Sequence, residues 1–317
     1  MNLVWWSLFG LASIYIVFIF APAVVSYFTV FSCKKAIPLD ERDLSQTYFG
    51  PHMPQITESL RLYDAIEFRP VSLRAYDGEM LTAQYCPGTK GRTAIFFHGY
   101  RACPRNNFSQ QAVDFHRQGY ELLLVNQRGH GESGGKQTTF GLAEKQDVIA
   151  WTNWAAQNNP AGKILLYGTS MGAAAVAYAA EQLNRAQVAA MVLDSGFICP
   201  YDMLALESKK RRVPCGIVLP IVRFLMKLFN NLDMKETTLA SLEKTKIPAL
   251  FLCGTADETV SDQLVRQAYH HCVSPKELVV AEGAAHTLAY LVGGLPVKSQ
   301  IMAFADRYFT AEEGDAI

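Results

Sequence analysis

The sequence lacks an excess of charge of either sign, and it lacks the residue spacings of common metal sites. Lys plus Arg and Asp plus Glu each number 29 in a chain of 317 residues, so the composition does not indicate a nucleic-acid partner. The seven cysteines form no C-x-x-C pair and have no paired histidine spacing. This pattern disfavours zinc or a redox dithiol and favours reduced, buried thiols, so we expect no metal site.

A second absence is local, because no charged side chain occurs from Leu3 to Ser32. At about 1.5 Å per residue, a helix of this length exceeds the roughly 30 Å core of a bilayer. Pro22 interrupts the segment, and transmembrane helices tolerate proline with a kink. The segment therefore predicts one N-terminal transmembrane helix, with residues 1–33 as a membrane anchor.

A cleaved signal peptide is the competing interpretation of this segment. Ala21-Pro22-Ala23 has the small-x-small form of a cleavage site, but no basic residue precedes the apolar run, which continues through Phe31. These features favour an uncleaved, single-pass anchor. Lys34 and Lys35 follow the segment directly, and the positive-inside rule then predicts that the rest of the chain lies in the cytoplasm.

The remainder predicts one α/β domain. Residues 34–65 contain scattered prolines and are expected to be a linker and pre-domain segment, residues 66–310 the domain, and residues 311–317 a tail. Asp77-Gly78 between two alternating runs, Val71–Tyr76 and Met80–Tyr85, predicts an antiparallel hairpin. Apolar runs then alternate with helical patterns, which predicts a mostly parallel sheet with helices on both faces. The predicted strands are Thr93–Phe97, Glu121–Val125, Ile164–Tyr167, Ala189–Leu193, Ala249–Cys253 and Leu278–Ala281.

The strand predicted at Ile164–Tyr167 is followed by Gly168-Thr169-Ser170-Met171-Gly172 and then by a helix-forming stretch at Ala173–Leu183. Strand, glycine-flanked serine and helix is the context in which G-x-S-x-G forms a nucleophile elbow. The turn needs small residues on both sides, because the serine is held in a strained backbone conformation. Ser170 is therefore the candidate nucleophile.

Two backbone amides could stabilise negative charge next to Ser170. Phe97-His98-Gly99-Tyr100 ends the first parallel strand, so its loop lies at the edge of the sheet where ligands bind. The amides of Tyr100 and Met171 are the predicted oxyanion hole. His98 is expected to orient this loop through hydrogen bonds and not to act in catalysis.

The stretch Gly129-His130-Gly131-Glu132-Ser133-Gly134 matches the dinucleotide-binding pattern G-x-G-x-x-G. No helix is predicted directly after it, and it lies well past the first strand of the sheet. We therefore expect a loop that contains several positive-φ glycines, and not a cofactor site.

An acid and a base follow the last two predicted strands. Asp257 comes after Ala249–Cys253, and His286 comes after Leu278–Ala281. The chain order Ser, Asp, His predicts a triad in which His286 accepts the proton of Ser170 and Asp257 orients the imidazole. Glu258 is the first alternative acid and Asp194 a weaker one.

These motifs together resemble the α/β-hydrolase superfamily, near its serine-aminopeptidase-like and monoacylglycerol-lipase-like branch. The resemblance covers residues 93–290 and is carried by F-F-H-G-Y at 96–100, N-Q-R-G-H-G-E-S at 126–133, G-T-S-M-G at 168–172, G-T-A-D at 254–257 and G-A-A-H at 283–286. It implies an α/β-hydrolase fold and serine hydrolase chemistry without a cofactor. It does not define the substrate, since this fold supports many activities.

The superfamily resemblance also implies a lid at about residues 197–245. Within it, the basic run Lys209–Arg212 precedes an apolar helical stretch at Gly216–Phe229. This composition is typical of an interfacial membrane helix, and it fits equally well a lid helix packed on the sheet. The sequence thus predicts a membrane-anchored serine hydrolase that cleaves esters or thioesters of an apolar acyl substrate such as a lipid. The alternatives are an aminopeptidase-like enzyme and a catalytically silent scaffold at the membrane, and the oligomeric state is left open.

Overall fold

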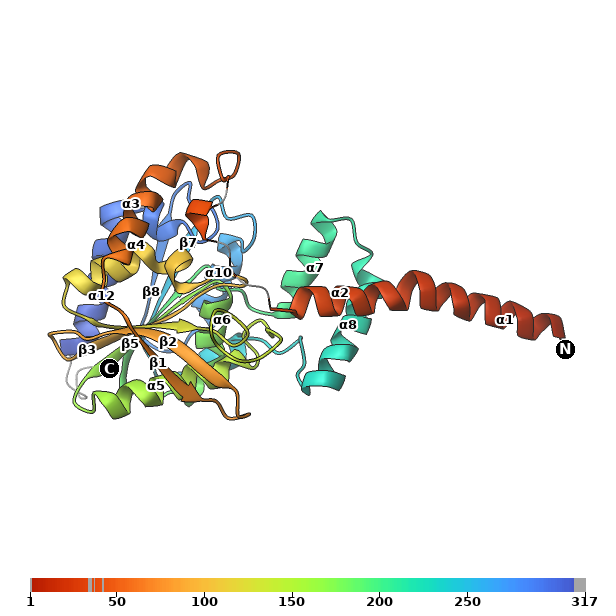
Figure 1. The fold of residues 1–317 in the computed structure, drawn as a ribbon, viewed down its shortest axis with the longest axis horizontal. Helices are drawn as coiled ribbons and strands as arrows, with labels where there is room; N and C mark the ends of the chain where they lie inside the picture. Colours follow the sequence, from red (N-terminus) through yellow and green to blue (C-terminus); the bar gives the residue numbers. More distant parts are fainter. Residues whose placement is uncertain (1, 34–35, 37, 42, 311–317) are drawn as a thin grey trace. The chain divides into compact units, whose positions relative to one another are not determined.

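A computed structural model describes residues 2–33, 36, 38–41 and 43–310 of the chain (Figure 1). The chain divides into two compact units. The larger unit contains Cys33–Ile198 and Thr237–Ile317, and the smaller unit contains Met1–Ser32 and Cys199–Glu236. Lys34 and Lys35, on which the predicted orientation depends, and the predicted tail 311–317 lie outside the described residues.

The larger unit is built on one eight-stranded sheet of strand order β1-β2-β4-β3-β5-β6-β7-β8. Strand β2 pairs antiparallel with β1 and β4, and all the other pairings are parallel, as the alternation of strands and helices predicts. The strands are β1 (Arg69–Arg74), β2 (Met80–Cys86), β3 (Arg92–Phe97), β4 (Glu121–Asn126), β5 (Lys163–Thr169), β6 (Val188–Asp194), β7 (Ala249–Gly254) and β8 (Lys276–Ala281).

The predicted hairpin is present as β1 and β2. Gly78 has φ +89°, which a side chain would strain, and the turn closes with the amide of Gly78 donating to the carbonyl of Ala75. The exposed residues of β1 alternate with partly buried ones, as expected for a strand at the edge of the sheet.

Helices cover both faces of the sheet. They are α3 (Met53–Asp64), α4 (Pro104–Arg117), α5 (Glu144–Asn158), α6 (Met171–Ala179), α9 (Leu239–Leu242), α10 (Asp262–His271), α11 (Ala289–Val292) and α12 (Gly294–Thr310), with 3₁₀ turns at Leu39–Glu41, Gly50–His52 and Ala180–Gln182.

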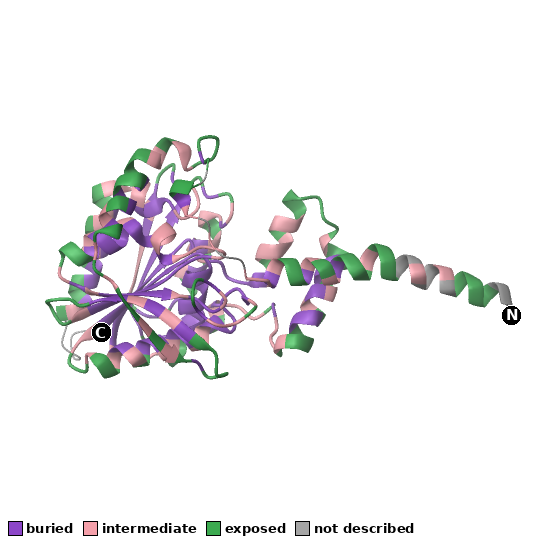
Figure 2. Cartoon of the chain, in the orientation of Figure 1, coloured by how far each residue is buried: buried purple, intermediate pink, exposed green. Residues whose placement is uncertain are grey.

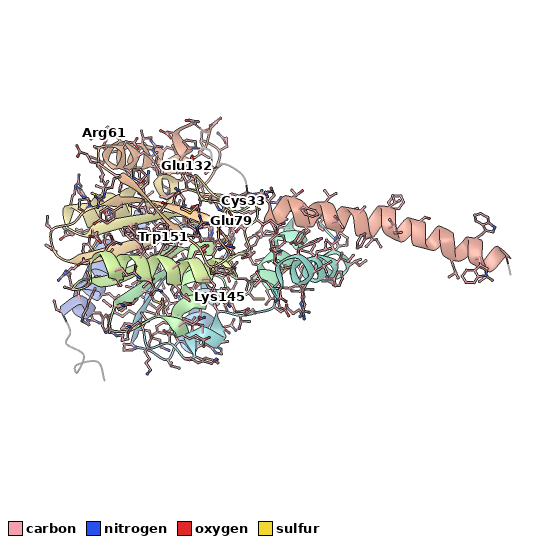
Figure 3. The ribbon with its side chains drawn as sticks, turned by 60° about the horizontal axis from the view of Figure 1, so that its bottom comes forward. Cys33, Arg61, Glu79, Glu132, Lys145 and Trp151 are labelled. Carbon is pink, nitrogen blue, oxygen red and sulfur yellow. The ribbon has the colours of Figure 1, made fainter. Side chains whose placement is uncertain are left out.

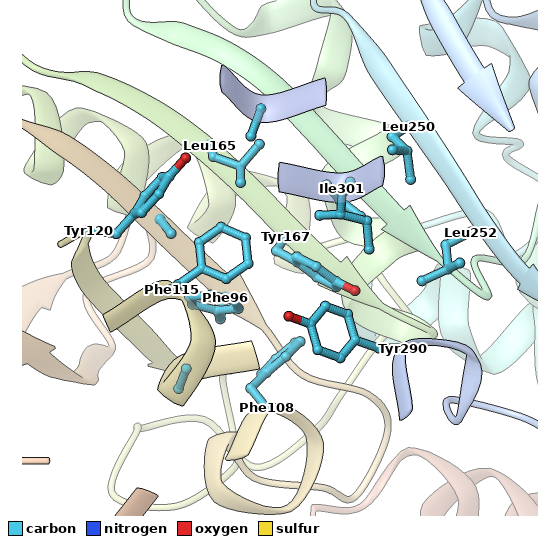
Figure 4. Close-up of a cluster of buried hydrophobic side chains, with 14 of the residues drawn as sticks. Phe96, Phe108, Phe115, Tyr120, Leu165, Tyr167, Leu250, Leu252, Tyr290 and Ile301 are labelled. Carbon is cyan, nitrogen blue, oxygen red and sulfur yellow. The ribbon is translucent and has the colours of Figure 1, made fainter. Parts of the chain in front are cut away.

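The main core lies between the sheet and the helices α4, α11 and α12. Phe96 of β3 and Tyr167 of β5 pack against Phe108 and Phe115 of α4, and Ile301 of α12 belongs to the same cluster (Figure 4). Burial of large apolar side chains of this kind contributes roughly 1.5–3 kcal/mol each. The central strands are accordingly buried along their whole length (Figure 2). This rigid sheet fixes the positions of the loops at its carboxyl edge.

The smaller unit is helical and joins two distant parts of the sequence. It contains α1 (Asn2–Tyr15), the π-helix η1 (Ile16–Phe20), α2 (Ala21–Phe31), α7 (Pro200–Lys210) and α8 (Cys215–Asn230). Helix α2 packs on α8, and Asn230 Nδ2 donates a hydrogen bond of 2.6 Å to the hydroxyl of Tyr27. The ring of Phe229 lies 5.8 Å from that of Tyr27. The N-terminal segment and the insertion Cys199–Glu236 are therefore joined by both polar and aromatic contacts.

The prediction of one continuous transmembrane helix is not supported. Over the described residues, the structure contains no helix that is both long enough and apolar enough to cross a membrane. The uncharged segment is divided into α1, η1 and α2 instead. The division coincides with Pro22, which has no N–H for the carbonyl four residues earlier, and that carbonyl belongs to Phe18 within η1.

Candidate active site

Ser170 lies in the sharp turn between β5 and α6, where the sequence predicts a nucleophile elbow. Its backbone has φ 54° and ψ −114°, a conformation that costs a non-glycine residue about 1–3 kcal/mol. The amide of Ser170 donates to the carbonyl of Asp194 on β6 (2.8 Å), and its carbonyl accepts from the amide of Ala174 in α6 (3.0 Å). The surrounding strand and helix hold the strained residue in place.

The two glycines of the motif are required because backbone passes directly over them. A Cβ added to Gly172 would lie 1.8 Å from the carbonyl oxygen of Phe97 at the end of β3. A Cβ added to Gly168 would lie 2.5 Å from the carbonyl oxygen of Gly172. Both distances are far below van der Waals contact, so the small-residue requirement of the motif is a packing requirement at these two positions.

The structure brings Ser170, His286 and Asp257 together from three different loops. His286 Nδ1 donates to Asp257 Oδ2 at 2.7 Å, and the hydroxyl of Ser170 donates to His286 Nε2 at 2.9 Å. The carboxylate can only accept, so it fixes the proton on Nδ1 and leaves Nε2 as the acceptor. A hydroxyl hydrogen-bonded to a neutral imidazole can lose its proton to that imidazole during attack on a carbonyl.

Asp257 is held rigidly behind the imidazole. Its side chain has no exposed surface, and its Oδ1 accepts hydrogen bonds of 2.8 Å from the amides of both Thr259 and Val260. Both carboxylate oxygens therefore have fixed partners, which sets the direction of the bond to His286. Thr287, the next residue along the chain, has φ 64°, so the loop that carries His286 is itself constrained.

The loop after β3 lies against Ser170. A Cβ added to Gly99 would be 3.4 Å from the Cβ of Ser170, which places the backbone of His98-Gly99-Tyr100 beside the hydroxyl. The amide of Gly99 donates to Asn107 Oδ1 of α4 (2.7 Å). Tyr100 follows Gly99 in this loop, and Met171 is the first residue of α6, directly after Ser170.

Two buried histidines fix the shape of that loop. His98 accepts at Nε2 from the amide of Gln127 (3.1 Å) and donates from Nδ1 to the carbonyl of Gly99 (2.8 Å). Burial lowers the pKa of His98 to about 3, so the ring stays neutral and keeps this donor–acceptor pattern. His130 accepts at Nε2 from the amide of Arg101 (3.1 Å), and burial also lowers its pKa.

Sequence reasoning missed three of these loop-orienting side chains. Gln127 and His130 lie in the stretch N-Q-R-G-H-G-E-S, and this motif was the only sequence feature that marked them. Their orienting role was missed because their hydrogen-bond partners are distant in sequence. Asn107 stands within α4 and had no local signal. The orienting role expected for His98 agrees with its contacts.

The two alternative acids occupy different positions. Glu258 follows Asp257 directly, and it is Asp257 whose Oδ2 accepts the hydrogen bond from His286 Nδ1. Asp194 is fully buried at the end of β6, and its Oδ1 accepts a hydrogen bond from the hydroxyl of Ser195 (3.0 Å). Among the described residues its Oδ2 has no hydrogen-bond partner, and burial raises the pKa of Asp194 to about 7.

The glycine-rich stretch 129–134 forms a loop, as expected. Gly129 and Gly131 have φ of +70° and +57°, and the next long helix, α5, begins only at Glu144. Arg128 anchors the loop through two hydrogen bonds of 2.7 Å to the buried carboxylate of Asp147. The stretch is therefore a structural support for the loop at Tyr100, because it carries His130.

Comparison with known proteins gives matches of three kinds. Residues 90–236 match the family described as serine aminopeptidase, S33. The uncharacterised protein YqkD of Bacillus subtilis is 28% identical over 236 residues, which cover 73% of this chain and 77% of that protein. The uncharacterised protein Rv2307c of Mycobacterium tuberculosis is 29% identical over 247 residues, which cover 77% and 79% of the two chains.

Among solved structures, an esterase of Pyrococcus furiosus superposes with a TM-score of 0.67 at 22% identity. The superposition covers 88% of this chain and 98% of the esterase. At this level of identity the likeness shows the fold. Together with the eight-stranded, mostly parallel sheet, it confirms the predicted α/β-hydrolase fold.

Proposed function

We propose that this chain, which has the α/β-hydrolase fold, is a serine hydrolase that cleaves ester or thioester bonds of apolar acyl groups. The observation that carries the proposal is the hydrogen-bonded series Ser170–His286–Asp257, with distances of 2.9 and 2.7 Å. In the proposed reaction Ser170 Oγ attacks the acyl carbonyl while His286 Nε2 accepts its proton. His286 then protonates the leaving group, and water hydrolyses the acyl enzyme by the same route.

The amides of Tyr100 and Met171 are proposed to bind the negative oxygen of the tetrahedral intermediate. The close approach of Gly99 to Ser170 supports this role for the Tyr100 loop, and the start of α6 at Met171 supports the other donor. Amides fixed in advance stabilise developing charge without reorganising, and removal of one such donor typically costs about 10²–10³ in kcat.

An apolar acyl group is favoured by the aromatic residues around Tyr100. The ring of Tyr100 stacks on that of Phe140, with 4.8 Å between the ring centroids. The centroid of the Phe140 ring lies 6.3 Å from that of Phe197. A structural neighbour, the Pyrococcus furiosus protein described as an esterase, has the same fold, which is consistent with ester cleavage by this chain. Attachment of this protein to a membrane and the role of residues 197–245 as a lid remain predictions.

A fluorophosphonate probe and p-nitrophenyl esters test the nucleophile directly. Ser170→Ala should abolish labelling and lower kcat/KM by at least about 10³-fold, because no other group supplies the attacking oxygen. The matched control is Ser299→Ala, an exposed serine of α12, which should behave as the unaltered protein. Unchanged labelling of Ser170→Ala would exclude this nucleophile. No labelling and no turnover of any short acyl ester in the unaltered protein would favour the silent scaffold.

An aminopeptidase is the second candidate, because the matching family is described as serine aminopeptidase, S33. The same triad would attack a peptide carbonyl, and a site for a free amino terminus would be needed as well. Aminoacyl p-nitroanilides, assayed beside the p-nitrophenyl ester of the same amino acid with and without an N-acyl block, separate the two candidates. Turnover of the anilide that requires the free amine would replace the esterase proposal by a peptidase.

A further inference from the structure

Exposed apolar side chains are concentrated on the smaller unit. Of the large apolar residues that are exposed in the described part of the chain, ten belong to residues 1–32 and six to the insertion Cys199–Glu236, while five belong to the rest. Monomeric soluble proteins rarely expose contiguous apolar surface on this scale, so such a surface indicates an interaction site.

Helix α8 is apolar on its exposed side as well as on its packed side. Val218, Val222 and Leu225 are buried, whereas Ile217, Phe224 and Leu228 are 50–60% exposed and form a second stripe at i, i+7 and i+11. The ring of exposed Phe28 in α2 lies 6.0 Å from that of exposed Phe229 in α8, so the apolar surface is continuous across the two helices.

The N-terminal helices expose apolar side chains on more than one side. Trp5 and Trp6 are consecutive and are 65% and 72% exposed, and Ile16–Phe18 are consecutive and 55–73% exposed. Consecutive residues of an α-helix point about 100° apart, and those of a π-helix differ by a somewhat smaller angle, so each group extends over more than one side of its helix. Figure 3 shows side chains projecting from opposite sides of this segment.

These observations favour lipid over a protein partner as the occupant. A partner protein or a second copy of the chain covers one side of a helix, whereas acyl chains surround it. The insertion adds charge of the matching kind, with seven basic and four acidic side chains. The ion pairs Asp233–Arg223 (2.7 Å) and Glu207–Lys210 (2.8 Å) each engage one acid and one base, so an excess of three basic side chains is left. The exposed run Lys209–Arg212 lies just before α8.

We propose that the smaller unit docks this protein on an anionic lipid bilayer. The exposed faces of α1, α2 and α8 enter the acyl region, and Lys209–Arg212 meets the anionic headgroups. The docking surface lies wholly within the smaller unit, and the proposal does not depend on the hydrolase activity. It also requires no helix that crosses the bilayer.

Flotation with vesicles tests the proposal. The full-length chain is diluted from detergent to below the critical micelle concentration and mixed with vesicles of phosphatidylcholine alone or with 30% phosphatidylserine. The protein should float with both kinds of vesicle, and it should bind the anionic vesicles with higher affinity. Phe224→Asp combined with Leu228→Asp should weaken binding to both kinds. The matched control is Val273→Asp with Leu295→Asp, two residues of the larger unit that are 65% and 75% exposed, and it should float normally.

A second variant tests the charge. Lys209→Glu with Arg211→Glu should weaken binding to anionic vesicles at least about 30-fold and leave binding to neutral vesicles unchanged. Two basic residues that contribute about 1 kcal/mol each account for a factor of about 30, and the introduced carboxylates add repulsion. The control reverses two exposed basic residues of the larger unit, Lys90→Glu with Arg117→Glu. Turnover of a short soluble ester, or circular dichroism if the protein has no esterase activity, verifies that each variant is folded.

The possible outcomes separate lipid from the other occupants. Flotation that the variants reduce and the controls preserve supports the bilayer as the occupant. A chain that stays at the bottom of the gradient with both kinds of vesicle overturns the proposal. If it instead forms a defined oligomer that Phe224→Asp with Leu228→Asp disrupts, the surface joins copies of the chain. Equal flotation of all the variants overturns the proposed role of these residues.

Discussion

Asp194 is a buried carboxyl group beside the elbow that is not part of the predicted triad. Its main-chain carbonyl accepts the amide of Ser170, while its side chain has one hydrogen-bonded oxygen and, among the described residues, one without a partner. Burial is the main reason that its pKa is raised to about 7, and the nearby Asp257 charge acts in the same direction, whereas Ser195, His286 and the hydroxyl of Tyr167 oppose it. The native state therefore holds this proton more tightly than the unfolded chain does.

The raised pKa of Asp194 predicts a specific pH dependence of stability. An unfolded aspartate titrates at about 4, so the free energy of unfolding should fall as pH rises from about 4 to about 7, by an amount on the order of 4 kcal/mol. Asp194→Asn cannot ionise and keeps the acceptor for Ser195. In urea denaturation, the free energy of unfolding of Asp194→Asn minus that of the unaltered protein should be lowest at pH 4 and should increase toward pH 8. A difference that does not vary with pH would contradict this assignment.

At the scale of elements, the elbow is a junction where β3, β5 and α6 are in backbone contact. Gly172→Ala would place a Cβ 1.8 Å from the carbonyl oxygen of Phe97, so strand and helix would have to separate. Because backbone cannot yield as a flexible side chain can, we expect destabilisation of more than about 3 kcal/mol and a large drop in Tm or in soluble yield.

Gly216→Ala is the matched control for this substitution. Gly216 is the second residue of α8, and a Cβ added there has nothing within 4 Å. Alanine in a helix is favoured over glycine by up to about 1 kcal/mol, so this variant should unfold at the same or a slightly higher temperature. Similar losses in both variants would mean that the contact at Gly172 relaxes more easily than its geometry suggests.

The elements that the sequence predicts well are those with local causes. The runs at Ile164–Tyr167 and Ala249–Cys253 are buried parallel strands because their neighbours on both faces are helices, and Asp77-Gly78 forms its turn from its own backbone preferences. The proximity of Ser170, Asp257 and His286 could be predicted from chain order and strand direction. The hydrogen bond from the Arg101 amide to His130 could not be predicted from the sequence, because it depends on the three-dimensional positions of two separate loops.

The division of the uncharged N-terminal segment into three helical pieces could not be predicted from the sequence either. Hydropathy and length measure how apolar residues 3–32 are, but they do not report whether the hydrogen-bond ladder is continuous. In the structure that ladder changes to π-helical geometry at Ile16–Phe20, just before Pro22, and the segment becomes three helical pieces.

At the scale of the whole molecule, the smaller unit is formed by two segments that are far apart in the sequence. They are the N-terminal segment and the insertion Cys199–Glu236. The hydrogen bond between Tyr27 and Asn230 joins residues 203 positions apart, a contact that no local periodicity indicates. Tyr27 is fully buried and the ring of Phe229 packs against it at a tilt of 41°, so α2 supplies part of the packing of α8. The folding of the insertion is therefore expected to depend on the N-terminal segment.

A chain that begins at Ala36 tests this dependence, because it removes α2 while the larger unit keeps its sheet and its core. Amide hydrogen exchange in α8 should rise at least tenfold, since burial of one aromatic side chain contributes roughly 1.5–3 kcal/mol to local stability. Exchange in β3–β7 should not change. Tyr27→Phe in the full-length chain removes only the hydrogen bond to Asn230, worth about 1 kcal/mol, and should raise exchange in α8 by less. Unchanged exchange in α8 of the shortened chain would show that the insertion folds without α2. Faster exchange throughout the sheet would show instead that the two units unfold together.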